Sequence, residues 1–171
     1  MKQVIGILGP SGSYSEEVAI KYFNNEKVIY FKTISRTLDA LNLKTIGKVI
    51  VPIKNSIYGD VKETSSWLSK HELKISKKLV LSIRHVIAGF GIVNPKKIKI
   101  IYSHPQALGQ CSRYIKKYYP NVTLVETSST SEAIKMIHRK KLKGALAIGS
   151  KVAAQKYKLY IIDDKIQDKI K

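Results

Sequence analysis

The stretch "QVIGILGPSGSYSEEVAIKYFNNEKVIYF" (residues 3–31) decides the fold. Its two apolar runs, 3–8 and 27–31, are rich in β-branched residues, which is typical of strands. Between them, residues 13–23 repeat apolar side chains at helical spacing. A strand, a helix and a strand joined by short links predict a β-α-β unit with parallel strands.

The same alternation continues along the chain. We expect further strands at 48–53, 97–102, 122–126, 144–149 and 159–162, an extended stretch at 79–93, and helices at 35–43, 65–73, 105–118, 131–141 and 151–157. This order predicts an α/β fold of two similar lobes, each with a mostly parallel sheet flanked by helices, and a ligand cleft between the lobes. Lobe 1 is expected to comprise residues 1–79 with about 163–171, and lobe 2 residues 80–162.

The composition is unusually basic, with 31 Lys and Arg against 12 Asp and Glu and a formal net charge of +19. Such an excess is compatible with nucleic-acid binding. However, the lysines are spread along the chain in short clusters, and neither an aromatic-interleaved basic motif of the RNP type nor zinc-finger spacing is found. The alternative is a set of solvated lysine faces together with a small anionic ligand. We therefore expect no specific nucleic-acid partner.

Hydrophobic residues make up 44% of the chain, enough for a packed core. No stretch approaches the roughly 18 apolar residues of a transmembrane helix, and the first residues read as a strand and a turn rather than a signal peptide. The single cysteine, Cys111, excludes an intrachain disulfide and is expected to be buried on a helix. These features predict a cytoplasmic protein with no membrane partner.

Polar residues mark the points where strands pass into helices. Ser13 with Glu16 and Ser129 with Glu132 fit the S-x-x-E capping box, and Pro105 stands at a favoured first helical position. Helix N-termini bind anions, so several of them at one cleft would suit a ligand with two carboxylates. The alternative is that each is an ordinary N-cap.

Five segments, taken in order, resemble the catalytic domain of the prephenate dehydratases. They are "GPSGSYSEEVA" (9–19), "VPIKNSIYGDV" (51–61), "SHPQALGQC" (103–111), "STSEA" (129–133) and "GALAIGSKVAAQKYKLYII" (144–162). The resemblance implies a two-lobed fold like the type II periplasmic binding proteins, with the active site between the lobes. It also implies conversion of prephenate to phenylpyruvate, water and carbon dioxide in phenylalanine biosynthesis, by a homodimer without metal or cofactor.

The resemblance also implies a set of site residues. Those expected to bind the prephenate dianion are Pro10, Ser11, Gly12, Lys54, Asn55, Ser56, Ser103, His104, Pro105 and Gln106. The family's favoured catalytic residue is the threonine of a Thr-Arg-Phe motif that this sequence does not show, so the candidates for donating a proton to the departing hydroxyl are other hydroxyls, Ser13, Ser129 and Thr130. For His104 the alternative is a ring that packs against or caps the helix, and His71, His85 and His138 are expected to be structural or exposed.

Two departures from the family pattern leave the function open at this point. Lys54 replaces the glutamate of the family's "ENS" segment, which reverses a charge beside the expected site. In addition, "KIQDKIK" (165–171) is not followed by the family's Thr-Arg-Phe motif, and a regulatory ACT domain is not expected. The chain is therefore interpreted as an active dehydratase that uses another hydroxyl, as an impaired relative, or as a binding module for an aromatic acid or amino acid.

Overall fold

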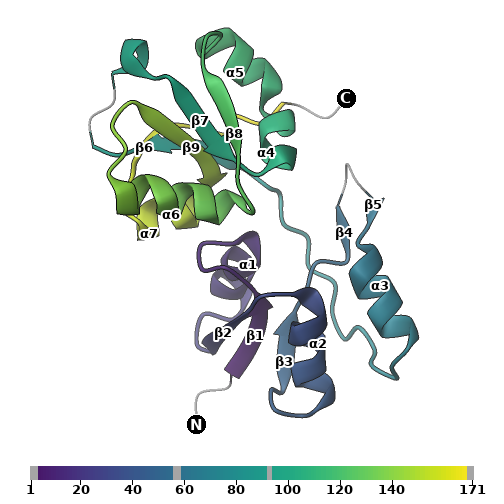
Figure 1. Ribbon diagram of the computed structural model, residues 1–171. Helices are drawn as coiled ribbons and strands as arrows, with labels where there is room; N and C mark the ends of the chain where they lie inside the picture. Colours follow the sequence, from purple (N-terminus) through teal and green to yellow (C-terminus); the bar gives the residue numbers. More distant parts are fainter. Residues whose placement is uncertain (1–3, 56–58, 92–93, 169–171) are drawn as a thin grey trace. The chain divides into compact units, whose positions relative to one another are not determined.

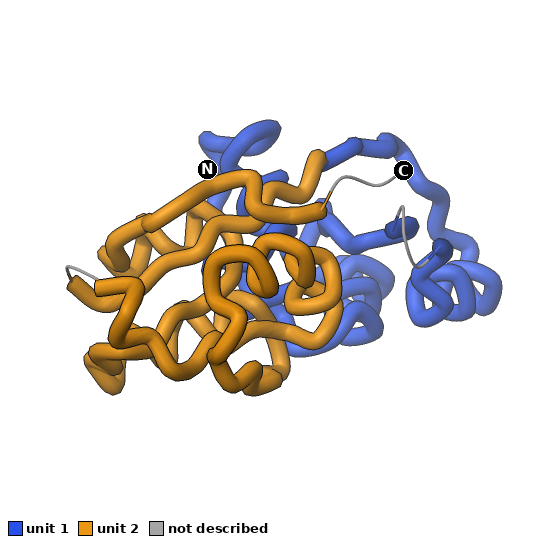
Figure 2. Tube along the Cα trace, turned by 90° about the horizontal axis from the view of Figure 1, so that it is seen from above, with its two compact units in different colours: residues 1–81 blue, residues 82–171 orange. Residues whose placement is uncertain are grey.

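The computed structural model describes residues 4–55, 59–91 and 94–168. The chain divides into two compact units, residues 1–81 and 82–171, called unit 1 and unit 2 here and coloured blue and orange in Figure 2.

Unit 1 is built on a three-stranded parallel sheet in the order β2-β1-β3. Its elements are β1 (Val4–Leu8), α1 (Tyr14–Tyr22), β2 (Lys27–Phe31), α2 (Ile34–Asn42), β3 (Lys48–Ile50), β4 (Lys54–Asn55), β5 (Gly59–Asp60) and α3 (Lys62–Ser69). The β-α-β unit predicted from residues 3–31 is confirmed, because β1 pairs with β2 in parallel from Val4 and Lys27 onward. The strand expected at 48–53 is shorter than predicted and ends at Ile50.

The sheet of unit 1 is covered on both faces, which explains its apolar strands. On one face, Ile5 and Ile7 pack against Ala19 of α1. A second cluster joins Ile34 and Leu38 of α2 to Trp67 of α3.

Unit 2 is built on a five-stranded sheet in the order β10-β6-β9-β7-β8. Its elements are β6 (His85–Gly89), η1 (Pro95–Lys97), β7 (Ile100–Ser103), α4 (Pro105–Gln110), α5 (Ser112–Tyr118), β8 (Thr123–Glu126), α6 (Thr130–Lys140), β9 (Ala145–Ser150), α7 (Lys151–Lys156) and β10 (Tyr160–Asp164). Strands β7, β8 and β9 are parallel, and β6 is antiparallel to both of its neighbours, β9 and β10. The predicted α/β class with mostly parallel sheets is confirmed.

Helices lie on both faces of this sheet (Figure 1). One core cluster contains residues of α4 and α5, and the other contains residues of α6 and α7. All residues of β6 and β9 are buried, as expected for central strands covered on both faces.

The helix expected at 105–118 is divided at Cys111 into α4 and α5. Cys111 is buried, as predicted, and burial together with the charge of Asp168 raises the pKa of its thiol to about 12. The thiol is therefore protonated at neutral pH and acts as a small apolar side chain.

The segment expected to return to lobe 1 lies in unit 2 as far as it is described. Ile166 is buried in the core that contains α4 and α5, and its N–H donates to the carbonyl of His85 at 3.2 Å. The carboxylate of Asp168 accepts hydrogen bonds from the Ser112 hydroxyl at 3.1 Å and the Arg113 N–H at 3.2 Å. These contacts hold residues 163–168 to the start of β6 and of α5, which is why they group with unit 2.

Within the described part of the chain, no helix has the length and apolar character required to cross a membrane.

Candidate active site

The residues predicted to bind the substrate fall in both units. In each unit they follow the ends of parallel strands, at what we call the carboxyl edge of its sheet. In unit 1 this edge carries the loop after β1 and the segment after β3. In unit 2 it carries the starts of α4, α6 and α7 and, because β6 runs the opposite way, the start of β6.

In unit 1 the loop between β1 and α1 closes around a buried carboxylate of the chain itself. Glu16 is only 6% exposed. It accepts hydrogen bonds from the Gly12 N–H, from the Ser11 hydroxyl at 3.1 Å and from the Tyr30 hydroxyl of β2 at 2.8 Å. The Gly12 N–H, which was expected to face a substrate carboxylate, is therefore bonded to Glu16.

Ser13 is the N-cap of α1, as the capping box predicts, and accepts from the Glu16 N–H at 3.3 Å. Its hydroxyl donates to the Leu8 carbonyl at 3.0 Å. In a capping box the Glu side chain accepts from the backbone N–H of the N-cap residue. Here the Ser13 N–H donates to the Pro10 carbonyl at 3.1 Å instead. Since the hydroxyl proton of Ser13 is held by a backbone carbonyl, this residue is less suited to proton donation than its sequence position indicates.

The segment after β3 continues into a short hairpin of β4 and β5. Lys54 is exposed and Asn55 is half-buried on β4, while Ser56 lies outside the described residues. The buried Thr64 of α3 donates to the Pro52 carbonyl at 2.6 Å, which fixes this segment against the helix.

In unit 2, Ser103 joins three strands at the carboxyl edge. It is fully buried at the end of β7, and its hydroxyl donates to the Ile148 carbonyl of β9 at 2.7 Å. Its carbonyl accepts from the Thr127 N–H, beyond β8, at 2.9 Å. The observed role of Ser103 is therefore to fix the sheet edge on which the neighbouring site residues stand.

His104 caps α4, as the capping alternative predicted. Its Nδ1 accepts from the Gln106 N–H at 3.3 Å, with Pro105 at the first helical position. An accepting Nδ1 places the proton of the neutral ring on Nε2. The half-buried ring thus keeps one N–H donor at the carboxyl edge.

Ser129 and Thr130 begin α6 at the same edge. Ser129 is the N-cap and accepts from the Glu132 N–H at 3.1 Å, whereas the Glu132 carboxylate lies 3.8 Å from the Lys135 ammonium. Thr130 is half-buried at the first helical position, and its hydroxyl has no hydrogen-bond partner among the described residues. The N–H groups of this first turn have no partner within the helix, so hydroxyl and N–H donors lie together.

The structure adds His85 to this edge, a residue expected to be structural or exposed. It is 2% exposed, and its Nε2 lies 2.7 Å from Oε1 of Gln110. Because an amide oxygen accepts, the His85 Nε2 carries the proton. Burial lowers the pKa of His85, and the hydrogen bond to Gln110 opposes this effect. The Gln167 side chain accepts from the His85 backbone N–H at 2.9 Å.

Sequence reasoning did not identify these partners. Gln110 is 25 positions from His85 in the chain, and Gln167 is 82 positions away. No local spacing rule connects such distant residues. The available signal was a histidine at the start of an apolar strand, which predicts a buried polar group that requires a partner.

Known proteins are similar in sequence to this chain over nearly its whole length. The family model described as prephenate dehydratase matches residues 5–171. The prephenate dehydratase of Methanocaldococcus jannaschii is 38% identical over 164 residues, which cover 93% of this chain and 58% of that protein. The prephenate dehydratase of Lactococcus lactis is 33% identical over 165 residues, which cover 96% and 58%. The chain thus spans 58% of the length of these two relatives.

Solved structures share the fold. The crystal structure of a prephenate dehydratase from Arthrobacter aurescens in complex with L-Phe matches with a TM-score of 0.89 and 24% identity. The match covers 97% of this chain and 56% of that one.

Proposed function

This chain belongs to the prephenate dehydratase family, and we propose that it catalyses the decarboxylating dehydration of prephenate to phenylpyruvate in phenylalanine biosynthesis. The observation that carries the proposal is the family match over residues 5–171. The hydroxyl and N–H donors at the starts of α4 and α6 support it, because prephenate is a dianion whose leaving group is a hydroxyl.

In the proposed reaction the ring carboxylate leaves as carbon dioxide. The electron pair of the breaking C–C bond enters the ring as the C–O bond to the hydroxyl breaks, and the hydroxide takes up a proton to leave as water. Each turnover converts a dianion to a monoanion and consumes one proton. The protein therefore has to hold two carboxylates and supply that proton, a task for fixed donors and a general acid.

Thr130 is the proton donor we favour among the three candidates. Its hydroxyl is half-buried and has no partner in the described structure, whereas the Ser13 hydroxyl donates to a carbonyl. The partial positive charge at the start of α6 stabilises the alkoxide that remains after proton transfer. Ser129 lies next to it and is the second candidate. We propose that the Nε2–H of His104, at the same edge of unit 2, is a further donor to the dianion.

The first test is release of phenylpyruvate from prephenate by the purified protein, followed by the absorbance of the enolate in alkali. Thr130→Val removes the hydroxyl and keeps the shape, so kcat is expected to fall at least about 100-fold with little change in KM. Thr130→Ser is expected to retain most of the activity. Thr123→Val, at an exposed position of β8, is the matched control and should leave kcat unchanged.

Two outcomes of this test would reject the proposal in different ways. Binding of prephenate by the wild type without phenylpyruvate release would reject the catalytic function. Turnover that survives in Thr130→Val would reject Thr130 as the acid. For Ser129, replacement by Asn keeps a good N-cap, adds no charge and removes the hydroxyl, so loss of kcat with unchanged stability would transfer the role to Ser129.

We also propose that the protein is a cytoplasmic homodimer. A homodimer is supported by exposed apolar side chains on α1 and on β2, an edge strand of the unit 1 sheet: Ile20, Ile29 and Tyr30. The cytoplasmic location is supported by the single buried cysteine, because exported proteins more often carry disulfides. Light scattering after size exclusion tests the first proposal, and cell fractionation tests the second.

A further inference from the structure

Ten of the 18 basic residues of unit 2 are exposed at the sheet edge opposite the candidate active site. We call this the amino edge, where β7, β8, β9 and β10 begin. Unit 2 has 18 Lys and Arg against 5 Asp and Glu, and so carries +13 of the chain's net charge of +19.

The topology explains why these charges gather. Helices α5 and α6 carry the chain back from the carboxyl edge to the amino edge. Both have basic residues in their last turn, where positive charge is favourable. The Lys99 N–H donates to the Gly144 carbonyl at 2.9 Å, which places the basic runs 96–99 and 139–143 side by side. The exposed basic residues of this edge are Lys96, Lys97, Lys99, Lys116, Lys117, Arg139, Lys140, Lys141, Lys143 and Lys158.

The acidic residues of unit 2 lie elsewhere. Glu126 and Asp164 end β8 and β10, and Glu132 lies in the first turn of α6. Asp163 and Asp168 are also at this carboxyl side of the sheet. The acidic residues of unit 2 therefore do not neutralise the basic residues of the amino edge.

Aromatic side chains accompany the lysines. Tyr118, which ends α5, is 53% exposed, and Tyr160, which begins β10, is 58% exposed. The Lys117 ammonium lies 4.9 Å from the centre of the Tyr118 ring. The two tyrosines stand toward opposite ends of an edge that is about 19 Å long, from five strands at their usual spacing.

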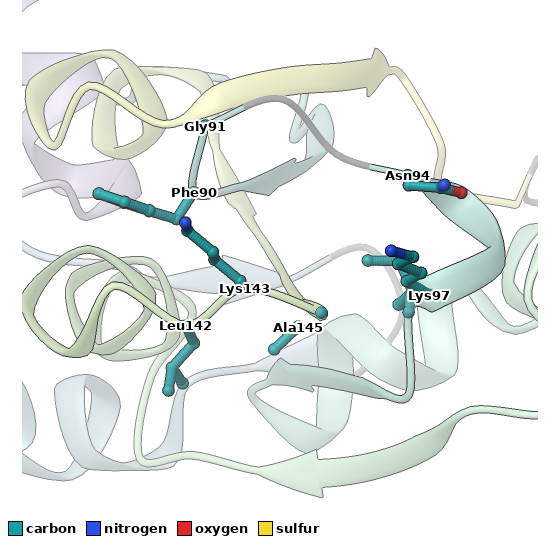
Figure 3. A pocket seen from close by; sticks show the side chains of 9 residues that line it. Phe90, Gly91, Asn94, Lys97, Leu142, Lys143 and Ala145 are labelled. Carbon is teal, nitrogen blue, oxygen red and sulfur yellow. The ribbon is translucent and has the colours of Figure 1, made fainter.

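Between them the edge contains a hollow of about 500 Å³. Figure 3 shows Lys143 and Phe90 on one side of it and Lys97 and Asn94 on the other. The hollow thus exposes cationic groups beside an aromatic ring in the middle of the edge.

We propose that the amino edge binds single-stranded nucleic acid without preference for base sequence. Its lysines contact phosphates, and Tyr118 and Tyr160 stack on unpaired bases, the combination typical of single-strand binding surfaces. Exposed tyrosines favour a single strand over a duplex, because the bases of a duplex are already stacked on one another. This activity is separate from the proposed dehydratase reaction and uses the opposite edge of the sheet.

The test is fluorescence anisotropy of a labelled oligothymidylate of about 20 nucleotides, titrated with the full chain over a range of NaCl concentrations. The edge variant combines Lys97→Gln, Lys140→Gln and Lys143→Gln. The control variant combines Lys74→Gln, Lys77→Gln and Lys78→Gln, and removes the same charge from exposed positions of unit 1. We expect the edge variant to reduce the slope of log K against log salt by about 2 and the control to leave it unchanged.

The tyrosines provide an independent measurement. Tyr118→Ala and Tyr160→Ala are each expected to weaken binding at least about fivefold. Tyr22→Ala is the matched control, because Tyr22 is an exposed tyrosine that ends α1, with the Lys21 ammonium 5.1 Å from its ring centre. This control should bind like the wild type.

Equal losses in the edge and control variants would overturn the proposal, since binding would then follow net charge alone. Tighter binding of a duplex of the same length would overturn the single-strand assignment. Thermal melting followed by circular dichroism checks that each variant is folded. If the edge variant is not folded, Lys96→Gln with Lys99→Gln and Lys117→Gln gives the same readout from neighbouring positions.

Discussion

At the scale of single residues, Glu16 organises the loop between β1 and α1. Its carboxylate accepts hydrogen bonds from the Ser11 hydroxyl and the Gly12 N–H of the loop, and from the Tyr30 hydroxyl at 2.8 Å. Tyr30→Phe removes one neutral donor and is expected to lower the free energy of unfolding by about 0.5–1.5 kcal/mol. Glu16→Gln places an amide N–H among donors and is expected to cost about 1–3 kcal/mol. Urea unfolding measures both changes.

The control for this prediction is Tyr22→Phe, at an exposed tyrosine of the same unit. It is expected to change the free energy of unfolding by less than about 0.5 kcal/mol. A loss in Tyr22→Phe as large as that in Tyr30→Phe would show that the Glu16 contact does not stabilise the loop.

His85 is expected to make stability depend on pH. Burial lowers its pKa in the folded state from the model-peptide value of 6.5. Between the folded pKa and 6.5, the unfolded chain binds a proton that the folded chain does not. The contribution of His85 is therefore fully present above pH 6.5 and is lost as the pH falls below it, with a slope of up to about 1.4 kcal/mol per pH unit.

Urea unfolding of the wild type and of His85→Gln between about pH 5.5 and 7.5 checks this dependence. The variant is expected to be less stable at neutral pH, because it loses the bond to Gln110, but to lack the His85 slope. His104→Gln, at a half-buried helix cap, should keep the slope. An unchanged slope in His85→Gln would contradict the assignment.

At the scale of elements, the packing of α6 on β9 depends on a glycine. A Cβ at Gly149 would lie 2.7 Å from Cγ1 of Ile134 and 3.2 Å from the Thr130 carbonyl, so Gly149→Ala forces α6 away from the sheet. The expected cost is about 1–3 kcal/mol. Because Thr130 moves with α6, kcat of the proposed reaction should fall as well.

Gly109→Ala is the opposite case and serves as the matched control. Gly109 is exposed within α4, and a Cβ there meets nothing within 4 Å. Alanine is the better helix former, so stability is expected to rise by about 0.5–1 kcal/mol. Thermal melting of the two variants distinguishes them by the sign of the change in Tm, and a gain in Gly149→Ala would contradict the packing argument.

The elements also show what the sequence could predict. Apolar periodicity indicated the strands and helices, because it records which faces are buried. It did not predict the break at Cys111, where apolar residues continue through both helices, or the antiparallel direction of β6. Capping residues located the starts of α1 and α6, but the acidic side chain of each box has other partners. Glu16 accepts from the loop and from Tyr30, and Glu132 lies near Lys135 of its own helix.

At the scale of the whole molecule, the candidate site residues divide between two units. Ser13 and Asn55 belong to unit 1, and His104 and Thr130 belong to unit 2. Motif order along the chain indicated which residues to consider for the site, whereas bonds such as that from His85 to Gln110 depend on the folded sheet edge. The contacts of Ile166 and Asp168 likewise required the structure, because their partners are far away in sequence.

The net charge of +19 is expected to give salt two opposite effects on this protein. Self-repulsion of like charges destabilises the compact state, and salt screens it, so Tm should rise as NaCl increases from about 20 to 500 mM. Each kcal/mol of repulsion removed corresponds to a rise of about 2–4 °C for a chain of this size. Binding of the oligothymidylate should weaken over the same range, because the same ions compete with its phosphates.

A variant that combines the edge and control substitutions, with six lysines replaced by Gln, separates screening from other effects of salt. Its lower charge should give a higher Tm than the wild type at low salt and a smaller rise with NaCl, because there is less repulsion to screen. Differential scanning calorimetry of both proteins over the salt series measures this difference. An equal rise in both would mean that salt acts on apolar burial rather than on charge, and a flat or falling Tm in the wild type would show that self-repulsion does not limit stability.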